Sequence, residues 1–162
     1  MSNFLQINSA YKYYNTPNYY QSSVQMPVQN RNYCLFDQNK VDYFVKQREN
    51  ALPYLTDILE HSNNEAQVTE TLYIMDRMID NGTKGIDKLY PVFSRFNQTK
   101  SPCIQTFLAG IYRKIQVPDA FGPLVNMLIK NSLAPRNPNQ AFDPNEEIGG
   151  AILSYISPQW RR

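Results

Sequence analysis

The chain has few of the side chains on which most enzymes and metalloproteins depend. Its 162 residues include one histidine, two cysteines and one tryptophan. Nucleophilic triads and dyads usually need a histidine, and zinc sites need several cysteine or histidine ligands. The single histidine, His61, stands at a predicted helix end, where its charge suits the helix dipole. We therefore expect no catalytic residues, no bound metal and no cofactor.

Long apolar runs and phosphate-binding loops are also missing. No stretch of about 18 apolar residues occurs, so no membrane span is predicted, and the glycine-rich dinucleotide and nucleotide-binding patterns are absent. The N-terminus has no basic segment followed by an apolar core, as a signal peptide would. Cys34 and Cys103 lie 69 residues apart, which suggests two separate reduced thiols. Together these features predict a cytoplasmic protein.

Residues 1–36 differ in composition from the rest of the chain. They hold six of the twelve tyrosines and ten Asn or Gln residues, but their only charges are Lys12 and Arg31. This composition without apolar periodicity predicts a disordered, low-complexity tail, followed by one folded domain over 37–162. The tail could be a flexible tether, or a recruitment segment whose tyrosines make adhesive contacts.

Charge is balanced within the predicted domain but unevenly placed along it. Residues 37–162 contain 14 basic and 14 acidic side chains, so the net charge of +2 comes from the tail. The segment 37–87 has an excess of acidic residues, whereas 88–136 has seven basic residues and one acidic residue. A neutral domain argues against binding to nucleic acid through phosphate neutralisation.

Three segments share a proline-centred pattern that indicates a repeat. Pro53, Pro91 and Pro123 are each followed by apolar residues one, two and five places later, and they are 38 and 32 residues apart. Such spacing is typical of stacked helix pairs. The first two of these prolines lie inside predicted helices over 40–61 and 85–96, and Pro53 should kink the first of these helices.

Two further helices match each other with a shift of 36 residues. The first is predicted over 65–79 and the second begins at Ser101 as N-cap and Pro102 as first helical residue. The matched apolar pairs are Val68 and Ile104, Leu72 and Leu108, Met75 and Ile111, and Ile79 and Ile115. This regularity is independent of the prolines and supports the same repeat.

The third unit is less regular than the first two. Its first helix is predicted over 118–131, and its second contains Ile148, Ile152 and Tyr155. Between them, residues 133–144 form a loop with three prolines, which is either a simple insertion or a binding loop. Trp160 either covers the last helix pair or belongs to a terminal binding peptide.

The segment Ala51–Glu60 resembles the first helix of a HEAT repeat, with its proline and flanking leucines. The resemblance is to the HEAT-like, armadillo-type architecture, and it implies an all-α fold: a short right-handed α-solenoid of about three helix pairs over 38–157. Two features of that family are not evident. The second helices lack the opening valine–arginine pair, and the ladder of Asp and Arg residues that often links repeats is not evident in the sequence.

In such arrays the second helices usually line the concave face, as the resemblance implies. The 36-residue shift pairs Arg77 with Arg113 on the side away from the core, and Tyr73 and Lys114 lie near these arginines. The same shift pairs Thr69 with Gln105. Arginine and tyrosine are enriched at protein interfaces. We therefore expect a non-enzymatic scaffold that binds a protein or peptide through Tyr73, Arg77, Gln105, Arg113 and Lys114.

Two alternatives remain open on the same scaffold. One is a nucleic-acid-binding repeat that uses the basic stretch 88–136. The other is a lyase or a glycosylase-like enzyme, for which Asp76, Asp80 and Tyr112 are the available polar candidates. Arg77 and Arg113 themselves have a simpler interpretation, as two solvated side chains on an exposed helix face.

Overall fold

A computed structural model describes residues 36–135, 137–140 and 143–161 of the chain, and the account below concerns these residues. Every regular element among them is a helix. The predicted tail, apart from Phe36, lies outside the described residues. No helix in the described part is long and apolar enough to cross a membrane.

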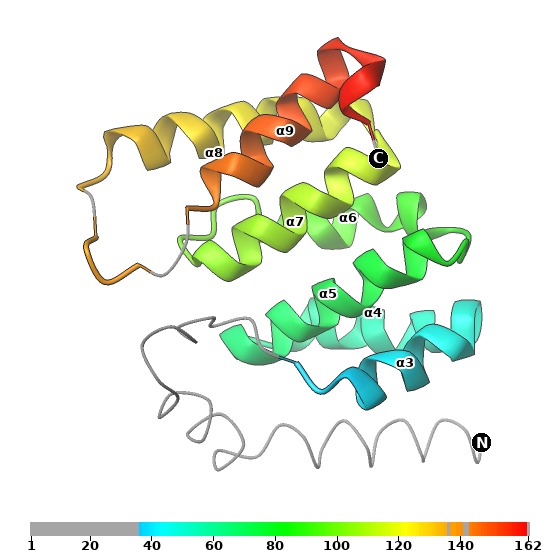
Figure 1. Cartoon of the computed structure of the whole chain (residues 1–162). Coiled ribbons are helices and arrows are strands. Elements are labelled where there is room, and N and C mark those ends of the chain that lie inside the picture. The colour runs from blue at the N-terminus through cyan, green and yellow to red at the C-terminus, as the bar shows by residue number, and fades with distance from the viewer. Residues whose placement is uncertain (1–35, 136, 141–142, 162) are drawn as a thin grey trace.

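The longer helices form two layers (Figure 1). One layer contains α5 (Glu65–Asp80), α7 (Pro102–Ile115) and α9 (Asn145–Ile156), and α7 packs between the other two. The second layer contains α4 (Leu52–His61), the short α6 (Tyr90–Phe93) and α8 (Phe121–Leu133). Helix α3 (Gln38–Gln47) packs on α5 at the N-terminal end of the array.

The matched apolar residues of α5 and α7 form the centre of the core. Leu72, Met75, Leu108 and Ile111 are fully buried, and Val68 and Ile104 are nearly so. Each buried aliphatic side chain of this size contributes about 1.5–3 kcal/mol of hydrophobic stabilisation. The 36-residue match in the sequence therefore marks the side of each helix that faces the core.

Three hydrogen bonds join helices across a sequence separation close to the 36-residue match. Arg95 Nη1 donates to Leu59 O at 2.6 Å, and Ser101 Oγ donates to Glu65 Oε1 at 2.6 Å, with 36 residues between the partners in each case. Further along, Gln116 Nε2 donates to Ser154 Oγ at 2.7 Å across 38 residues. These three contacts therefore join residues that lie 36 or 38 positions apart in the sequence.

Side chains cap the N-termini of α3 and α7, and the cap expected at Ser101 is confirmed. Asp37 Oδ1 accepts a hydrogen bond from Lys40 N at 3.1 Å at the start of α3. Ser101 Oγ accepts from Ile104 N at 3.3 Å at the start of α7, with Pro102 in the first turn. These side chains satisfy backbone donors that an α-helix leaves without partners at its N-terminus.

The expected kinked helix over 40–61 is wrong, because the chain breaks before the proline. Arg48 has a φ of 51°, and a 3₁₀ turn, η2 (Arg48–Ala51), separates α3 from α4. Pro53 then lies in the first turn of α4, where its missing N–H would have no helical partner.

The expected helix over 85–96 is also divided into short pieces. It consists of η3 (Ile86–Leu89), α6 and η4 (Ser94–Phe96), and Pro91 again lies in a first turn. The C-terminal units begin and end with 3₁₀ turns as well, namely η5 (Pro118–Ala120) before α8 and η6 (Pro158–Trp160) after α9. Proline thus starts helices in this fold and does not kink them.

Cys103 differs from its sequence expectation. Its side chain is buried at the start of α7 and is disulfide-bonded, so the expectation of a reduced thiol there is wrong. The other cysteine, Cys34, lies outside the described residues.

Candidate partner-binding face

The five residues expected to contact a partner lie on α5 and α7, but the structure gives them different roles. Tyr73 and Arg77 belong to α5, and Gln105, Arg113 and Lys114 belong to α7. Arg77 is exposed and makes no ion pair with the described residues. Of the five predicted contact residues, Arg77 therefore has the charged group that a partner can reach.

Tyr73 belongs to an aromatic cluster that spans the two helices. Its ring stacks on Phe36 at a centroid distance of 4.6 Å and meets Phe107 edge-on at 5.4 Å. Phe36 also meets Phe107 at 5.7 Å, so its ring is held by one aromatic side chain from each helix. We call Tyr73 and Phe107 the aromatic cradle. It holds a residue that precedes α3 and whose backbone is not helical.

Arg113 is held by the C-terminal part of the chain. Its side chain is 12% exposed, and its Nε donates to Trp160 O at 2.6 Å. Nη1 lies 3.7 Å from Glu147 Oε1 on α9. The guanidinium therefore joins α7 to α9 and to η6, and Arg77 and Arg113 do not present two equivalent charges in successive rows.

Lys114 forms ion pairs with two carboxylates on helix α5. Its side chain is only 7% exposed, and Nζ lies 2.8 Å from Asp76 Oδ1 and 2.9 Å from Asp80 Oδ1. Burial raises the pKa of the Asp76 carboxyl above its ordinary value, whereas the hydrogen bond and the charge of Lys114 oppose this rise. The ammonium thus compensates two carboxylates on α5.

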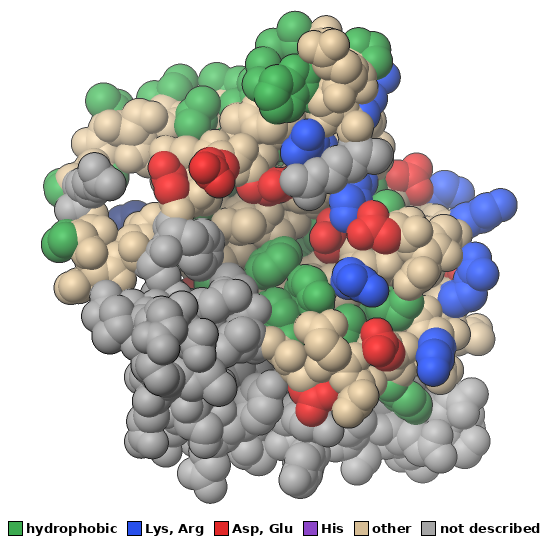
Figure 2. All heavy atoms as spheres, in the orientation of Figure 1, with side chains coloured by type: hydrophobic (Ala, Val, Ile, Leu, Met, Phe, Trp, Pro, Cys, Tyr) green, Lys and Arg blue, Asp and Glu red, His purple; other side chains and the backbone are tan. Residues whose placement is uncertain are grey.

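These contacts form a ladder of charges across α5, α7 and α9 (Figure 2). Gly110 lies within it, because a Cβ at this position would lie 3.6 Å from Asp76 Oδ1 and 3.7 Å from Glu147 Oε1. These charged contacts between α5, α7 and α9 were not evident in the sequence. The ladder uses lysine as well as arginine, and its acidic members come from helices on both sides of α7.

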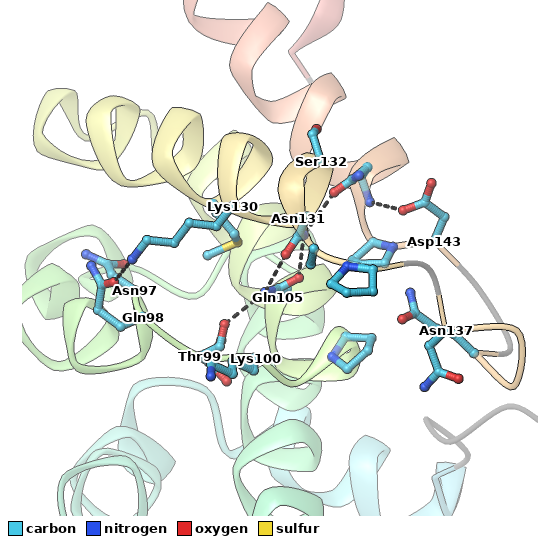
Figure 3. A pocket seen from close by; sticks show the side chains of 17 residues that line it. Asn97, Gln98, Thr99, Lys100, Gln105, Lys130, Asn131, Ser132, Asn137 and Asp143 are labelled. Atoms are coloured by element: carbon cyan, nitrogen blue, oxygen red, sulfur yellow. Dashed lines mark hydrogen bonds between the residues drawn. The ribbon is translucent and has the colours of Figure 1, made fainter.

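Gln105 is buried on the side of α7 that faces α8. Its Nε2 donates to Thr99 O at 2.8 Å, and its Oε1 accepts from Asn131 Nδ2 at 2.8 Å. Asn131 also donates to Asn145 Oδ1 at 2.9 Å at the start of α9 (Figure 3). This amide network connects three helices, so Gln105 lies away from the exposed face that carries Arg77.

The network forms part of a cavity of about 890 Å³ beneath the loop between α8 and α9 (Figure 3). Pro135, Asn137 and Asp143 from this loop line it, so the loop singled out in the sequence does border a cavity. Most of the other polar groups are amides, with two lysines: Asn97, Gln98, Lys100, Gln105, Lys130, Asn131, Gln140 and Asn145. Lys130 Nζ donates to Gln98 Oε1.

One group of possible metal ligands comes together on α4. Asp57, Glu60 and His61 are exposed, and their ligand atoms lie within 4.8 Å of one another. His61 Nδ1 is 3.2 Å from Asp57 Oδ1. The spacing of three and four residues on a helix could have revealed this group in the sequence. Exposed acidic groups of this kind are common without an ion, and we assign no metal to them.

The residues considered for an enzyme do not converge on a cavity. Tyr112 is fully buried, and its hydroxyl donates to Asn97 Oδ1 at 2.6 Å. Burial raises the pKa of Tyr112 far above the ordinary tyrosine value. Asp76 and Asp80 both bind Lys114. These three side chains have structural partners and no common reacting position.

Sequence reasoning missed the two phenylalanines of the aromatic cluster. Phe36 was placed at the end of the tail, and Phe107 lies one position away from the core residue Leu108. An aromatic residue adjacent to an apolar stripe is the one available signal for Phe107. For Phe36 no signal exists, since its contact depends on how the segment before α3 approaches α5 and α7.

Comparison of the chain with protein-family models, with curated proteins and with solved structures finds no match.

Proposed function

We propose that the chain is a non-enzymatic interaction module, built as a short right-handed α-solenoid of HEAT-like helix pairs. In this proposal it binds an extended peptide segment of a partner protein along α5 and α7. The paired helices, the two layers and the repeated spacing of hydrogen bonds between units support the solenoid. Such arrays offer extended surfaces for binding.

The observation that carries the proposal is the position of Phe36 in the aromatic cradle. Residue 36 precedes the first described helix, and its ring is held between Tyr73 of α5 and Phe107 of α7. This face therefore accommodates an aromatic side chain on a non-helical backbone. Aromatic pairs of this geometry contribute about 0.5–1.5 kcal/mol beyond the area that they bury.

Arg77 lies one helical turn from Tyr73 on α5, and its guanidinium is available to a ligand. A peptide with an aromatic residue for the cradle and a carboxylate about one turn away would use both groups. Arginine pairs with carboxylates through two parallel hydrogen bonds. We therefore expect the partner segment to combine an aromatic anchor with an acidic residue.

A peptide library displayed on phage and selected against the immobilised full-length protein tests this function. We expect the selected peptides to contain an aromatic residue, and Arg77→Glu to weaken their binding by roughly tenfold, or about 1.4 kcal/mol. Lys88→Glu is the matched control, because it makes the same charge change at an exposed residue of the other layer.

The variant Phe36→Ala gives a second measurement on the same peptides. It empties the cradle, so it should strengthen the binding of a peptide that competes with Phe36. Selected peptides without an aromatic residue, or equal losses in Arg77→Glu and Lys88→Glu, would contradict the proposal. Arg113→Glu is unsuitable for this test, since it would remove the contacts of Arg113 with Trp160 and Glu147.

Binding of nucleic acid through residues 88–136 has less support. Of its basic side chains, Arg95, Arg113 and Lys114 are engaged within the fold. An enzyme also has less support, because Asp76, Asp80 and Tyr112 are occupied by structural contacts.

A further inference from the structure

The residue in the aromatic cradle is joined directly to a helix on its C-terminal side. Phe36 lies 4.6 Å from the ring of Tyr73 and 5.7 Å from the ring of Phe107. The next residue, Asp37, caps α3, since its Oδ1 accepts a hydrogen bond from Lys40 N. Helix α3 in turn packs on α5. The array therefore anchors Phe36 from the side that follows it in the chain.

A covalent link lies one helical turn from the cradle. Cys103 is disulfide-bonded, and its side chain is only 4% exposed in the first turn of α7. Phe107 follows four residues later, so the two residues share one side of the helix, with Cβ atoms about 5–6 Å apart. The disulfide thus belongs to the side of α7 that carries the aromatic cradle.

The number of cysteines indicates the partner of Cys103. The chain has one other cysteine, Cys34, two residues before Phe36. Two residues of extended chain span at most about 7 Å, and the Cα atoms of a disulfide are usually about 4.4–6.8 Å apart. Because the Phe36 ring contacts Phe107, a residue two places before Phe36 is within reach of Cys103.

We infer that Cys34 and Cys103 form a disulfide within one chain, and that this bond controls access to the aromatic cradle. While the bond is intact, Phe36 has an anchor on each side, the disulfide before it and α3 after it. Its ring then stays in the cradle and excludes the aromatic residue of a partner peptide. Reduction removes one anchor and lets Phe36 leave. The inference rests on the proposed function, because it describes how peptide binding to the cradle is regulated.

The position of the bond allows this change without loss of the fold. Cys103 lies outside the cluster of buried side chains that forms the core, whereas its neighbour Ile104 belongs to it. Leu108 and Ile111 of the same helix are fully buried in that cluster. Reduction should therefore free the segment before α3 and leave the packing of α5 against α7 unchanged.

Reduction of the bond needs a dithiol as the source of two electrons. A thiolate of the dithiol attacks the sulfur of Cys34 and forms a mixed disulfide with it, because burial shields the sulfur of Cys103. The sulfur of Cys103 leaves as a thiolate in the first turn of α7, where a helix favours negative charge, and takes a proton from water. The second thiol of the dithiol then breaks the mixed disulfide, releases Cys34 as a thiol and leaves the dithiol as a cyclic disulfide.

Peptide mapping of the full-length chain by mass spectrometry tests the pairing. The protein is purified without reductant, its free thiols are blocked with iodoacetamide in urea, and it is then digested. We expect one linked pair of peptides, which joins Cys34 to Cys103 and is lost after treatment with dithiothreitol. Alkylation of both cysteines before reduction, or a disulfide between two chains in non-reducing electrophoresis, would overturn the inference.

Nuclear magnetic resonance tests the release of Phe36 without any peptide. In protein with labelled phenylalanine rings, the Phe36 signals are assigned from their loss in Phe36→Ala. We expect dithiothreitol to shift the ring signals of Phe36 and Phe107, because the two rings contact each other. The ring of Phe93, which is fully buried elsewhere in the core, is the internal control and should not shift. Unchanged Phe36 signals after reduction would show that the bond does not hold the ring in the cradle.

Peptide affinity measures the regulation itself. A synthetic copy of a selected peptide should bind roughly fivefold more tightly after reduction, because the apparent affinity scales with the fraction of chains whose cradle is free. Cys34→Ser should bind as the reduced protein does, with or without dithiothreitol. Cys103→Ala gives the same comparison from the other side of the bond. Phe36→Ala should bind equally well under both conditions, since no ring then occupies the cradle.

The failure of this inference differs from a failure of the proposed function. Equal peptide affinity before and after reduction would overturn the regulation while leaving peptide binding intact. If no peptide is selected, the proposed function fails, and the ring signals of Phe36 alone decide whether reduction opens the cradle.

Discussion

At the scale of single residues, Lys40 and Glu70 form an ion pair inside the fold. Both side chains are fully buried, and they join α3 to α5 through one hydrogen bond from Nζ to Oε1. Burial lowers the pKa of Lys40 and raises the pKa of Glu70, in each case against the attraction of the partner charge. The desolvation of such a pair can exceed its electrostatic gain.

This pair leads to a prediction about stability. The variant Lys40→Met leaves the Glu70 carboxylate buried without its ammonium partner, and we expect it to lower the free energy of unfolding by about 3–5 kcal/mol. The double variant Lys40→Met with Glu70→Leu removes both charges and should recover most of that loss. Urea denaturation of the three proteins measures the differences, and equal losses in the single and double variants would contradict the interpretation.

Single residues also explain why two predicted contact residues, Arg113 and Lys114, have structural roles. The sequence placed Arg113 and Lys114 on the side of α7 away from the core, but their long side chains reach carboxylates on α9 and α5. Helical periodicity gives the direction of Cβ. It does not give the end point of a flexible side chain, which depends on the charges that neighbouring helices place nearby.

At the scale of the elements, the sequence predicted where helices lie better than it predicted where they are interrupted. The start of α7 at Ser101 and Pro102 was predicted from side-chain chemistry, since these residues satisfy or avoid backbone donors. The break at Arg48 was not predicted, because a left-handed φ is unusual for arginine. Its guanidinium donates to Gly82 O at 3.2 Å, a contact 34 residues away.

The glycine pair in α9 provides a prediction with an internal control. A Cβ on Gly149 would meet no atom within 4 Å, whereas a Cβ on Gly150 would lie 2.9 Å from Arg113 Nη1. Gly149→Ala should therefore raise the free energy of unfolding by about 0.5–1 kcal/mol, through the higher helix propensity of alanine.

Gly150→Ala should lack this gain, because the methyl group displaces the guanidinium from Trp160 O. The loss of a hydrogen bond of this kind costs about 1 kcal/mol. Thermal or urea denaturation compares the two variants. An equal gain in both would show that Arg113 moves aside without cost, and that its contact does not hold η6 in place.

At the scale of the whole molecule, charge is distributed so that opposite signs meet between units. Residues 37–87 have an acidic excess and residues 88–136 a basic excess, and the helices of these two segments pack against each other. Lys114 binds carboxylates of the preceding unit, and Arg113 contacts a carboxylate of the following one. The lengthwise asymmetry of the sequence is thus partly neutralised by stacking.

We accordingly predict that the full-length chain binds nucleic acid weakly and without sequence preference. Fluorescence anisotropy with labelled single- and double-stranded DNA and RNA, repeated at several salt concentrations, measures this. A protein that neutralises many phosphates loses affinity steeply as salt rises, with a logarithmic slope of about 0.9 for each phosphate contacted on duplex DNA. Tight binding with a steep slope would favour the nucleic-acid alternative over a peptide partner.

The sequence by itself determined the all-helical class and the core-facing side of α5 and α7. These properties follow from local rules: apolar residues recur with the helical period, and caps and prolines mark helix starts. Tertiary structure alone decided the aromatic cradle and the charge ladder. Each of these depends on which side chains from distant units meet, and that is fixed only when the helices pack.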